Sequence, residues 1–413
     1  MDAGITGGGI GDAYAPYSPE HMADPYAITA RARIEEPVFY SPALGAWVVT
    51  RYEDVLAVLR DHRRFGIAVL RARETRYTDE TRAILAASPI LATSLVQMDP
   101  PEHTRMRGSI TQALSAQRIA GLEPRIRELC DGLIDRFEGE RRADFLARFA
   151  HPFPIMVIGS LLDVPEADFA ALERWSDDLV RLLGGEVPPD EQAECARGYV
   201  AVNRYVFDLA ERRRQAPGHD LASALIGAVE AGEAPLSSEE VGSLLRILLV
   251  AGFETTIKLM GTCLLHLLAE RERWLGIVEN PTRIPAVVEE TLRFDGPLLG
   301  TMRQTREPVE LGGKAIPAGA MVWASNSSAN HDEAVFSEAG RYDATRERTA
   351  GHLAFGQGVH FCIGAPLARL EMRVALERLS ARLPSLRLVP GQRLEYPPNI
   401  ILRGLRELLV EWD

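Results

Sequence analysis

The sequence predicts a mainly α-helical protein with a few short β-strands, and two observations support this fold class. Apolar residues recur at spacings of three and four, the period of an amphipathic helix, along most of the chain. The clearest such segments are residues 54–59, 101–114, 122–137, 166–183, 191–214, 241–270, 285–294 and 367–383. Runs with the two-residue period of a strand are few and short.

The longest predicted helix has a clear start signal. Ser237 is followed three residues later by Glu240, which is the capping-box pattern of a helix N-terminus. The helical pattern then continues to about residue 269. At about 1.5 Å per residue, a helix of this length can cross a whole domain.

Three groups of short strands are expected. Residues 38–40 and 46–50 flank a turn with proline and glycine, and they predict a hairpin. A second group covers residues 309–311, 315–316 and 321–324. A third candidate covers residues 402–410.

Composition and charge exclude several protein classes. The chain has 413 residues, of which 46 % are hydrophobic and 25 % charged, as in ordinary globular proteins. The formal net charge of −12 argues against general binding of nucleic acids or anionic membranes. The longest apolar stretch, residues 244–252, includes Arg246 and is far shorter than the roughly 20 residues that span a bilayer, so no membrane span is expected. Four scattered cysteines without a Cys-x-x-Cys pair favour the cytoplasm over secretion.

Two features predict the domain organisation. Residues 1–14 are rich in glycine and lack a basic segment, so we expect a flexible tail and not a signal peptide. No linker rich in Ser, Gly or Pro interrupts residues 15–413, so we expect a single domain there.

The most informative stretch is the loop at residues 355–364, Phe-Gly-Gln-Gly-Val-His-Phe-Cys-Ile-Gly. Gly356 and Gly358 permit a tight turn with positive φ, and Gly364 removes a side chain where a flat group could approach the backbone. A helical pattern follows at once, so Cys362 lies at a helix N-terminus, where the macrodipole favours a thiolate. Such a thiolate is a candidate iron ligand. A buried structural cysteine in a glycine-rich turn is the alternative.

This loop resembles the heme-ligand loop of the cytochrome P450 family, Phe-Gly-x-Gly-x-His-x-Cys-x-Gly, which is among the more specific signatures of any enzyme family. The resemblance extends from about residue 24 to the C-terminus and is to the soluble bacterial type. It implies the cytochrome P450 fold, a helical triangular prism with small β-sheets. It also implies heme b (iron protoporphyrin IX) as the cofactor, with Cys362 as axial thiolate and with Phe355, Gly356 and Gly364 beside it.

A polar pair interrupts the apolar run of the longest predicted helix. Burying Glu254 and Thr255 there costs free energy. The Thr255 hydroxyl can donate to the carbonyl of Ala251, four residues back, and loosen the helix locally. Gly252 has no side chain and so leaves room beside the pair, where the cofactor is expected. The pair resembles the acid–threonine pair of the family, which implies that Thr255 steadies oxygen during its activation and that Glu254 supplies protons. A kinked core helix without this chemistry is the alternative.

Further matches imply anchors for the cofactor and its loop. Glu290 and Arg293 resemble the family's Glu-x-x-Arg pair, and Arg341 matches the arginine that joins it in a buried ion network. Losing one member of such a network strands a buried charge.

Heme carries two propionates, which need cationic or N–H donors. The residues that match the family's propionate contacts are His103, Arg107, Arg303 and His360. A solvated surface charge is the alternative for each.

By the same resemblance, we expect a monooxygenase that inserts one oxygen atom from O2 into a medium-sized apolar substrate of secondary metabolism, by hydroxylation or epoxidation. Electrons are expected from a ferredoxin and its NAD(P)H-dependent reductase. The ferredoxin is expected to dock on a basic patch with Arg105, Arg369 and Arg373, and a solvated charged face is the alternative for these arginines. The expected pocket is mainly aliphatic and draws on Leu91, Leu95, Val96, Leu244, Ile247, Leu248, Ala251, Leu298, Leu299, Thr301, Asn399 and Ile400. Two alternatives stay open: a member that couples rings, desaturates or uses peroxide, and a heme protein that binds ligand without turnover.

Overall fold

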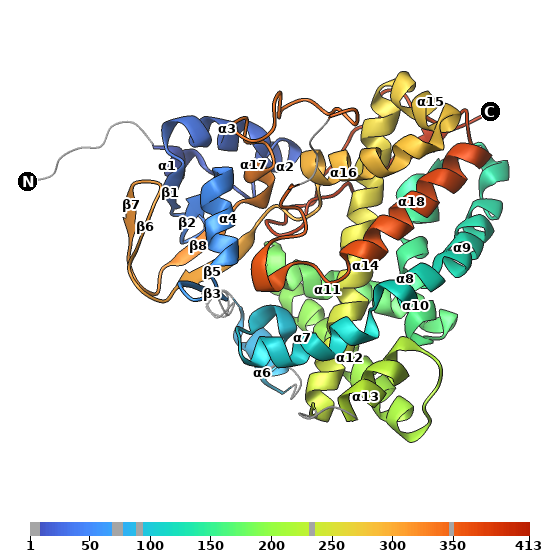
Figure 1. Ribbon diagram of the computed structural model, residues 1–413, viewed down its shortest axis with the longest axis horizontal. Helices are drawn as coiled ribbons and strands as arrows, with labels where there is room; N and C mark the ends of the chain where they lie inside the picture. The colour runs from blue at the N-terminus through green and yellow to red at the C-terminus, as the bar shows by residue number, and fades with distance from the viewer. Residues whose placement is uncertain (1–8, 68–76, 88–93, 231–235, 347–350) are drawn as a thin grey trace, which may run out of the picture. The chain divides into compact units, whose positions relative to one another are not determined.

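The computed structural model describes residues 9–67, 77–87, 94–230, 236–346 and 351–413 (Figure 1). Contacts between residues divide the chain into two compact units, each assembled from three separate segments. The first unit comprises Met1–Ala68, Glu289–Cys362 and Glu395–Arg403, and the second comprises Val69–Val288, Ile363–Leu394 and Gly404–Asp413. The two units therefore alternate along the chain, and the single domain over residues 15–413 stays a prediction.

The first unit is built around a five-stranded sheet with the order β1-β2-β8-β5-β3. Its strands are β1 (Val38–Ser41), β2 (Ala46–Val49), β3 (Phe65–Ile67), β5 (Thr301–Thr305) and β8 (Met321–Ala324). β1 and β2 form the predicted antiparallel hairpin, whereas β2 pairs in parallel with β8. A second hairpin, β6 (Val309–Leu311) with β7 (Lys314–Ile316), projects on the left of Figure 1.

Short helices and two apolar cores complete the first unit. The helices are α1 (Ile10–Ala13), α2 (Pro19–Ala23), α3 (Tyr26–Glu35), α4 (Tyr52–Arg60), α17 (Asn326–Ala329) and the end of α16 (Ile284–Asp295). One core joins α4 to the sheet, with Val55 and Phe65 among its members. The other includes Phe39, Trp323 and Ile400. Burial of these side chains holds distant chain segments together.

The start of the chain departs from the predicted flexible tail over residues 1–14. Residues 10–13 form α1, and Ile10 and Tyr14 are buried in the same apolar core as Phe39. The Tyr14 and Phe39 rings meet edge to face, with centroids 5.5 Å apart. The apolar area that Ile10 and Tyr14 bury offsets the conformational entropy lost when this N-terminal segment becomes ordered. Residues 1–8 lie outside the described residues.

The second unit is mainly helical. Its helices are α6 (Asp79–Ala86), α7 (Glu102–Ala113), α8 (Ala116–Gly121), α9 (Glu123–Asp135), α10 (Pro152–Leu162), α11 (Phe169–Gly184), α12 (Pro189–Gln215), α13 (Leu221–Glu230), α14 (Ser238–Ala269), α15 (Arg271–Glu279) and α18 (Ala365–Arg382), with the start of α16. Three short strands form an antiparallel sheet, in the order β4 (Arg142–Asp144), β10 (Leu409–Glu411) and β9 (Arg387–Leu388).

Helix α14 is the centre of the second unit. The predicted capping box is confirmed, with Ser237 and Glu240 each accepting a hydrogen bond from the other's backbone N–H. The helix contacts α10, α12 and α18 and runs through the unit in yellow in Figure 1. Most of its side chains are buried, so packing holds the helix rigidly and fixes the position of its few accessible residues.

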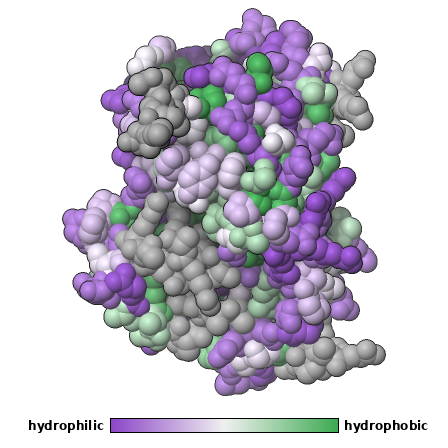
Figure 2. All heavy atoms as spheres, turned by 90° about the vertical axis from the view of Figure 1, so that its left-hand side faces the viewer, coloured by the Kyte–Doolittle hydropathy of each residue, from purple (hydrophilic) through white to green (hydrophobic). Residues whose placement is uncertain are grey.

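By length and composition alone, α14 could cross a membrane, contrary to the expectation from the sequence. Its most apolar 18-residue window has a mean hydropathy of 1.5, and 72 % of that window is buried inside the structure. Core helices of globular proteins pass the same test. The face drawn in Figure 2 is mostly hydrophilic, with its apolar side chains in small separate groups.

Most predicted helices are confirmed to within a few residues. A helix with one buried face and one solvent-exposed face shows the three- and four-residue spacing of apolar residues that makes it predictable. Helix α10 escaped prediction because it is apolar and buried on nearly every side and so shows no helical period. Strand β5 is polar at four of five positions and was missed for that reason. The strand predicted over residues 402–410 is confirmed only as β10, while Leu402 forms an isolated bridge with Leu298.

Candidate functional site

The cysteine loop folds back on itself through backbone hydrogen bonds. The Cys362 N–H donates to the Phe355 carbonyl at 2.9 Å, and the Phe361 N–H donates to the Gly358 carbonyl at 3.1 Å. A short 3₁₀ turn, Gly358–His360, lies between them, and α18 begins at Ala365 directly after its N-cap Gly364. Cys362 is therefore held just before a helix N-terminus, as the sequence predicts.

Two glycines make this loop geometry possible. Gly356 and Gly358 have φ of +68° and +72°, which confirms the predicted positive φ. A Cβ at Gly358 would lie 2.6 Å from the Leu59 carbonyl oxygen at the end of α4, so this position also needs the absence of a side chain. Gly364 has a φ of −81°, so its own backbone conformation does not require glycine.

Among the four cysteines, Cys362 fits the ligand role best. Cys130, Cys195 and Cys263 are buried, whereas Cys362 is only half-buried. Burial raises the pKa of Cys130 well above its usual range and that of Cys195 to about 11, which keeps both thiols protonated. A single accessible cysteine in an open glycine loop suits a thiolate that meets a flat cofactor.

In the second unit, α14 presents a narrow accessible strip. Ile247, Ala251 and Thr255 lie four residues apart on one face and are accessible, although their neighbours are mostly buried. The Thr255 hydroxyl donates to the Ala251 carbonyl at 3.0 Å, as predicted. The helix assignment is nevertheless continuous over Ser238–Ala269, so the expected loosening is not seen.

Glu254 is buried beside this strip, and its carboxylate has one cationic partner on the same helix. The Lys258 ammonium lies 3.2 Å from Glu254 Oε2. Burial raises the pKa of Glu254, and Asp177 raises it further, whereas Lys258 and His151 oppose the shift. The carboxyl group therefore holds a proton more readily than an exposed glutamate does. Lys258 was not identified from the sequence, although its i,i+4 spacing from Glu254 is the signal that could have found it.

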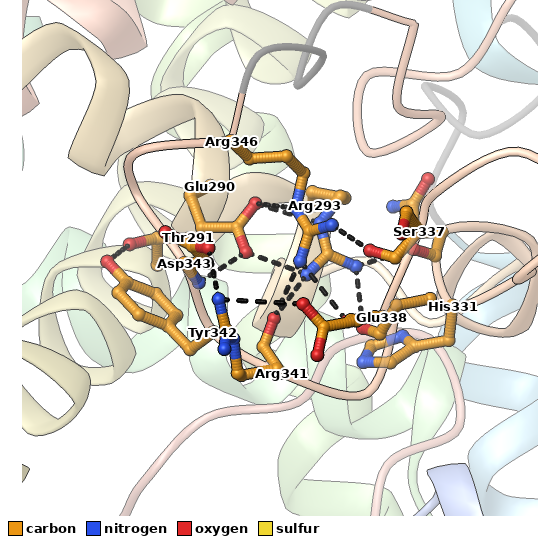
Figure 3. A network of polar contacts seen from close by, with 12 residues as sticks. Glu290, Thr291, Arg293, His331, Ser337, Glu338, Arg341, Tyr342, Asp343 and Arg346 are labelled. Atoms are coloured by element: carbon orange, nitrogen blue, oxygen red, sulfur yellow. Dashed lines mark hydrogen bonds and ion pairs between the residues drawn. The ribbon is translucent and has the colours of Figure 1, made fainter.

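Behind the cysteine loop, Glu290 and Arg293 form the predicted buried pair (Figure 3). Two guanidinium nitrogens of Arg293 donate to the Glu290 carboxylate at 2.8 and 2.7 Å, and both side chains are fully buried. Arg293 also donates to the carbonyls of Asn330 and Ala339, each at 2.9 Å. Its donors are therefore well matched, as a buried guanidinium requires.

The third arginine of this network is not the predicted Arg341. The Arg341 guanidinium turns to Asp343 and Glu338 and is largely exposed, while its backbone carbonyl accepts from Arg293 at 3.1 Å. The Arg346 guanidinium lies 3.5 Å from Glu290 instead, and this side chain is only 10 % exposed (Figure 3). The segment between them is irregular, so spacing along the sequence cannot say which arginine points inward.

Asn330, which the sequence did not single out, connects this network to the cysteine loop. Its carbonyl accepts from Arg293, and its side-chain oxygen accepts from the Leu353 N–H at 2.6 Å. The Leu353 carbonyl in turn accepts from the Gly356 N–H at 2.9 Å. The ion pair is thus linked by hydrogen bonds to the loop that holds Cys362.

The four candidate propionate donors fall into two pairs. His103, buried, and Arg107, half-buried, share one face of α7 in the second unit. Arg303 is buried on β5 and His360 is half-buried in the 3₁₀ turn, both in the first unit. Imidazole and guanidinium N–H groups suit carboxylates, so the donors of each pair fit a heme propionate, and the half-buried Cys362 thiol fits the iron.

The candidate pocket residues differ in how accessible they are. Leu244, Leu248 and Leu95 are buried, while Val96 is exposed. Leu91 lies outside the described residues. On α14, Ile247 and Ala251 are accessible, and their contact with a substrate stays a prediction.

In the first unit, Leu298 and Thr301 are partly accessible, whereas Leu299 and Ile400 are buried in the core that contains Tyr14. The placement of Leu299 and Ile400 in the substrate pocket stays a prediction. The buried Asn399 side chain accepts from the backbone N–H groups of residues 401 and 402, so it shapes the turn.

Comparison with known proteins gives consistent matches. The Cytochrome P450 family profile matches residues 282–383. Cytochrome P450 107B1 of Saccharopolyspora erythraea is 40 % identical over 372 residues, covering 89 % of each chain. Mycinamicin IV hydroxylase/epoxidase of Micromonospora griseorubida is 41 % identical over 371 residues, again covering 89 % of each chain.

A solved structure extends this similarity to the fold. Cytochrome P450 CREJ, in complex with (4-ethylphenyl) dihydrogen phosphate, superposes with a TM-score of 0.91 at 30 % identity, covering 97 % of this chain and 99 % of that one. The predicted fold class, mainly α-helical with small sheets, is confirmed. The chain therefore belongs to the cytochrome P450 family and is a heme-thiolate monooxygenase.

Proposed function

We propose that this monooxygenase hydroxylates or epoxidises a medium-sized apolar organic compound in the cytoplasm, with electrons from an external ferredoxin and its NAD(P)H-dependent reductase. The observation that carries the proposal is the buried Glu254 next to Thr255 on the accessible strip of α14. An enzyme that activates O2 needs a proton supply of this kind inside an apolar wall. A heme protein that only binds a ligand has no use for one.

When bound, the heme supplies the oxidising chemistry that transfers an oxygen atom to carbon. Cys362 would ligate the iron, and the fixed loop around it keeps the thiolate in one position. His103, Arg107, Arg303 and His360 would hold the propionates. The Glu290–Arg293 network would keep the loop in place through Asn330.

The proton route runs from the surface to Thr255 within the second unit. His151, whose Nδ1 lies 2.5 Å from Glu173, is partly exposed and acts electrostatically on Glu254 together with Asp177. Glu254 can take up a proton on this side and pass it to Thr255 Oγ1, because a hydroxyl both donates and accepts. Lys258 holds the Glu254 carboxyl between turnovers.

The substrate is proposed from the pocket and from relatives. Ile247 and Ala251 in the second unit offer aliphatic contacts, and Leu298 offers another in the first unit, beside Thr301. Contacts of this kind suit an apolar compound. One relative is named as a hydroxylase/epoxidase of mycinamicin IV. Another relative, 36 % identical over 403 residues, is named as a hydroxylase of 6-deoxyerythronolide B. These two compounds are the first to test.

The electron donor is proposed from the family, with a changed docking patch. Arg105 pairs with Glu240, and Arg373 pairs with Glu123 at 2.5 Å, so two of the three arginines expected to face an acidic ferredoxin are neutralised. A surface ion pair still exchanges partners at little cost. Docking would therefore have to compete with these carboxylates.

The decisive experiment compares Thr255→Ala with Thr256→Ala, using a surrogate ferredoxin system. Thr256 makes the same bond to the carbonyl four residues back, at 3.2 Å, but it is buried away from the strip. We expect Thr255→Ala to keep NAD(P)H consumption and to release hydrogen peroxide in place of most product, while Thr256→Ala stays coupled. Wild-type coupling in Thr255→Ala would refute this proton route. Product formed equally well from added peroxide by both proteins would favour the peroxide-using alternative.

A further inference from the structure

A second buried ion network lies in the first unit, two residues further along α16 than Arg293, and is formed by Tyr26, Asp295, Tyr396 and Arg403. The Arg403 guanidinium pairs with the Asp295 carboxylate, and both side chains are 4 % exposed. The Tyr26 hydroxyl donates to Asp295 Oδ1 at 2.7 Å. The Arg403 guanidinium carbon lies 3.9 Å from the centroid of the Tyr396 ring, which is the geometry of a cation–π contact.

Arg403 uses all three of its nitrogens. Nε donates to the Met22 carbonyl and one terminal nitrogen to the Ala23 carbonyl, each at 3.0 Å, while the other terminal nitrogen binds Asp295. The network therefore joins three separate parts of the chain: the end of α2, the end of α16 and the segment 395–403. A planar guanidinium can satisfy such divergent acceptors, whereas one ammonium cannot.

The ion pair stands at one end of two segments that carry candidate pocket residues. Asp295 precedes residues 297–301, and Arg403 ends residues 399–403. Between the segments, the Arg403 N–H donates to the Pro297 carbonyl at 2.8 Å and the Leu299 N–H donates to the Ile401 carbonyl at 3.0 Å. Leu298 and Leu402 form an isolated bridge and not part of a named strand. So short a ladder fixes the register weakly, and a slip of one residue would exchange the accessible and buried faces.

We propose that the Asp295–Arg403 network is a positioning device that sets the register of segments 297–301 and 399–403 and thereby the shape of the substrate pocket. This inference rests on the proposed function, in which Leu298 and Thr301 of the first segment contact the substrate. The network differs from the Glu290–Arg293 pair, which is linked to the cysteine loop. Disturbing Arg403 should therefore change what the pocket accepts and leave the thiolate–heme centre unchanged.

The test uses the heme-loaded protein and two probes whose nitrogen binds heme iron, imidazole and the bulkier 4-phenylimidazole, followed by optical titration. Arg403→Lys keeps the charge but cannot satisfy three divergent acceptors. Tyr396→Leu removes the stacked ring of a half-buried residue and leaves the ion pair, so it serves if Arg403→Lys folds poorly. Arg387→Lys is the matched control, because Arg387 pairs with Glu411 and Asp413 on the surface.

We expect Arg403→Lys and Tyr396→Leu to weaken 4-phenylimidazole binding by about fivefold or more, since small displacements in a fitted site are costly. Imidazole affinity, heme content and the thiolate band of the reduced carbonyl complex should match the wild type, as should every property of Arg387→Lys. An unchanged ratio of the two affinities in both variants, with only a lower melting temperature, would overturn the inference. A wild type that binds both probes equally would overturn the proposed pocket, and the inference with it.

Discussion

Replacing Gly358 by alanine tests how the cysteine loop is held against α4. Gly358 and Gly391 share a φ of +72°. Alanine in this left-handed backbone conformation is therefore destabilised equally at both positions, by about 1–2 kcal/mol. Around Gly391, no heavy atom of the described structure lies within 4 Å of the added Cβ. At Gly358, the Cβ would lie 2.6 Å from the Leu59 carbonyl oxygen and 3.1 Å from the Arg60 Cα.

Those neighbours are backbone atoms and cannot turn aside, so the loop itself must move. Overpacking of this kind costs about 1–3 kcal/mol more. The displaced turn includes the bond from the Phe361 N–H to the Gly358 carbonyl, one residue before Cys362. Gly358→Ala should therefore lose both stability and part of its thiolate signal, whereas Gly391→Ala should lose stability alone.

The measurements are thermal unfolding by circular dichroism and the fraction of reduced carbonyl complex that shows the red-shifted thiolate band. Gly358→Ala is expected to be about 1–3 kcal/mol less stable than Gly391→Ala. Equal destabilisation of the two variants, with a full thiolate band in both, would show that the loop does not rest on α4 as described.

Three further predictions follow from buried groups. Glu290→Gln should lower the free energy of unfolding by about 3–5 kcal/mol and reduce the heme content, because it leaves the buried Arg293 without its carboxylate partner. The control Glu35→Gln, in the exposed pair with Arg31, should have the melting temperature of the wild type. Normal heme content in Glu290→Gln would exclude the anchoring role. Cys362→Ala should abolish the thiolate band while Cys130→Ala keeps it, and a surviving band in Cys362→Ala would mean that another residue ligates the iron. Burial lowers the pKa of His331 from 6.5 to about 4. Below pH 6.5 the unfolded chain therefore takes up a proton on this histidine that the folded protein does not bind until about pH 4. The free energy of unfolding is unaffected above pH 6.5 and falls by up to about 3 kcal/mol as the pH drops to 4. Melting curves at pH 7 and pH 4.5 should therefore show a smaller loss for His331→Gln than for the wild type or for the exposed His219→Gln, and equal losses would contradict this assignment.

Local and periodic signals were enough to predict α14 and the cysteine loop. The capping box of α14 joins residues three apart, and the bond from Thr255 to Ala251 joins residues four apart on one helix. Positive φ at Gly356 and Gly358 follows from the glycines themselves. Such features depend on neighbours in sequence, so the sequence alone determines them.

Other features depend on which distant segments meet. Asp295 and Arg403 are 108 residues apart, and no spacing rule connects them. Arg346 and not Arg341 reaches Glu290, because the irregular segment between them has no period that would aim a side chain. Leu299 and Ile400 are buried in the same apolar core as Tyr14, because burial of apolar area against a folded N-terminal segment is favourable.

The sequence by itself therefore determined the helical fold class, the glycine loop around Cys362 and the Glu254–Thr255 pair, because each is written within one helical turn or one tight loop. Only the tertiary structure decided which arginine completes the Glu290 network and which of the candidate pocket side chains are buried. Those choices are made by burial and charge pairing between segments that the chain brings together only when it folds.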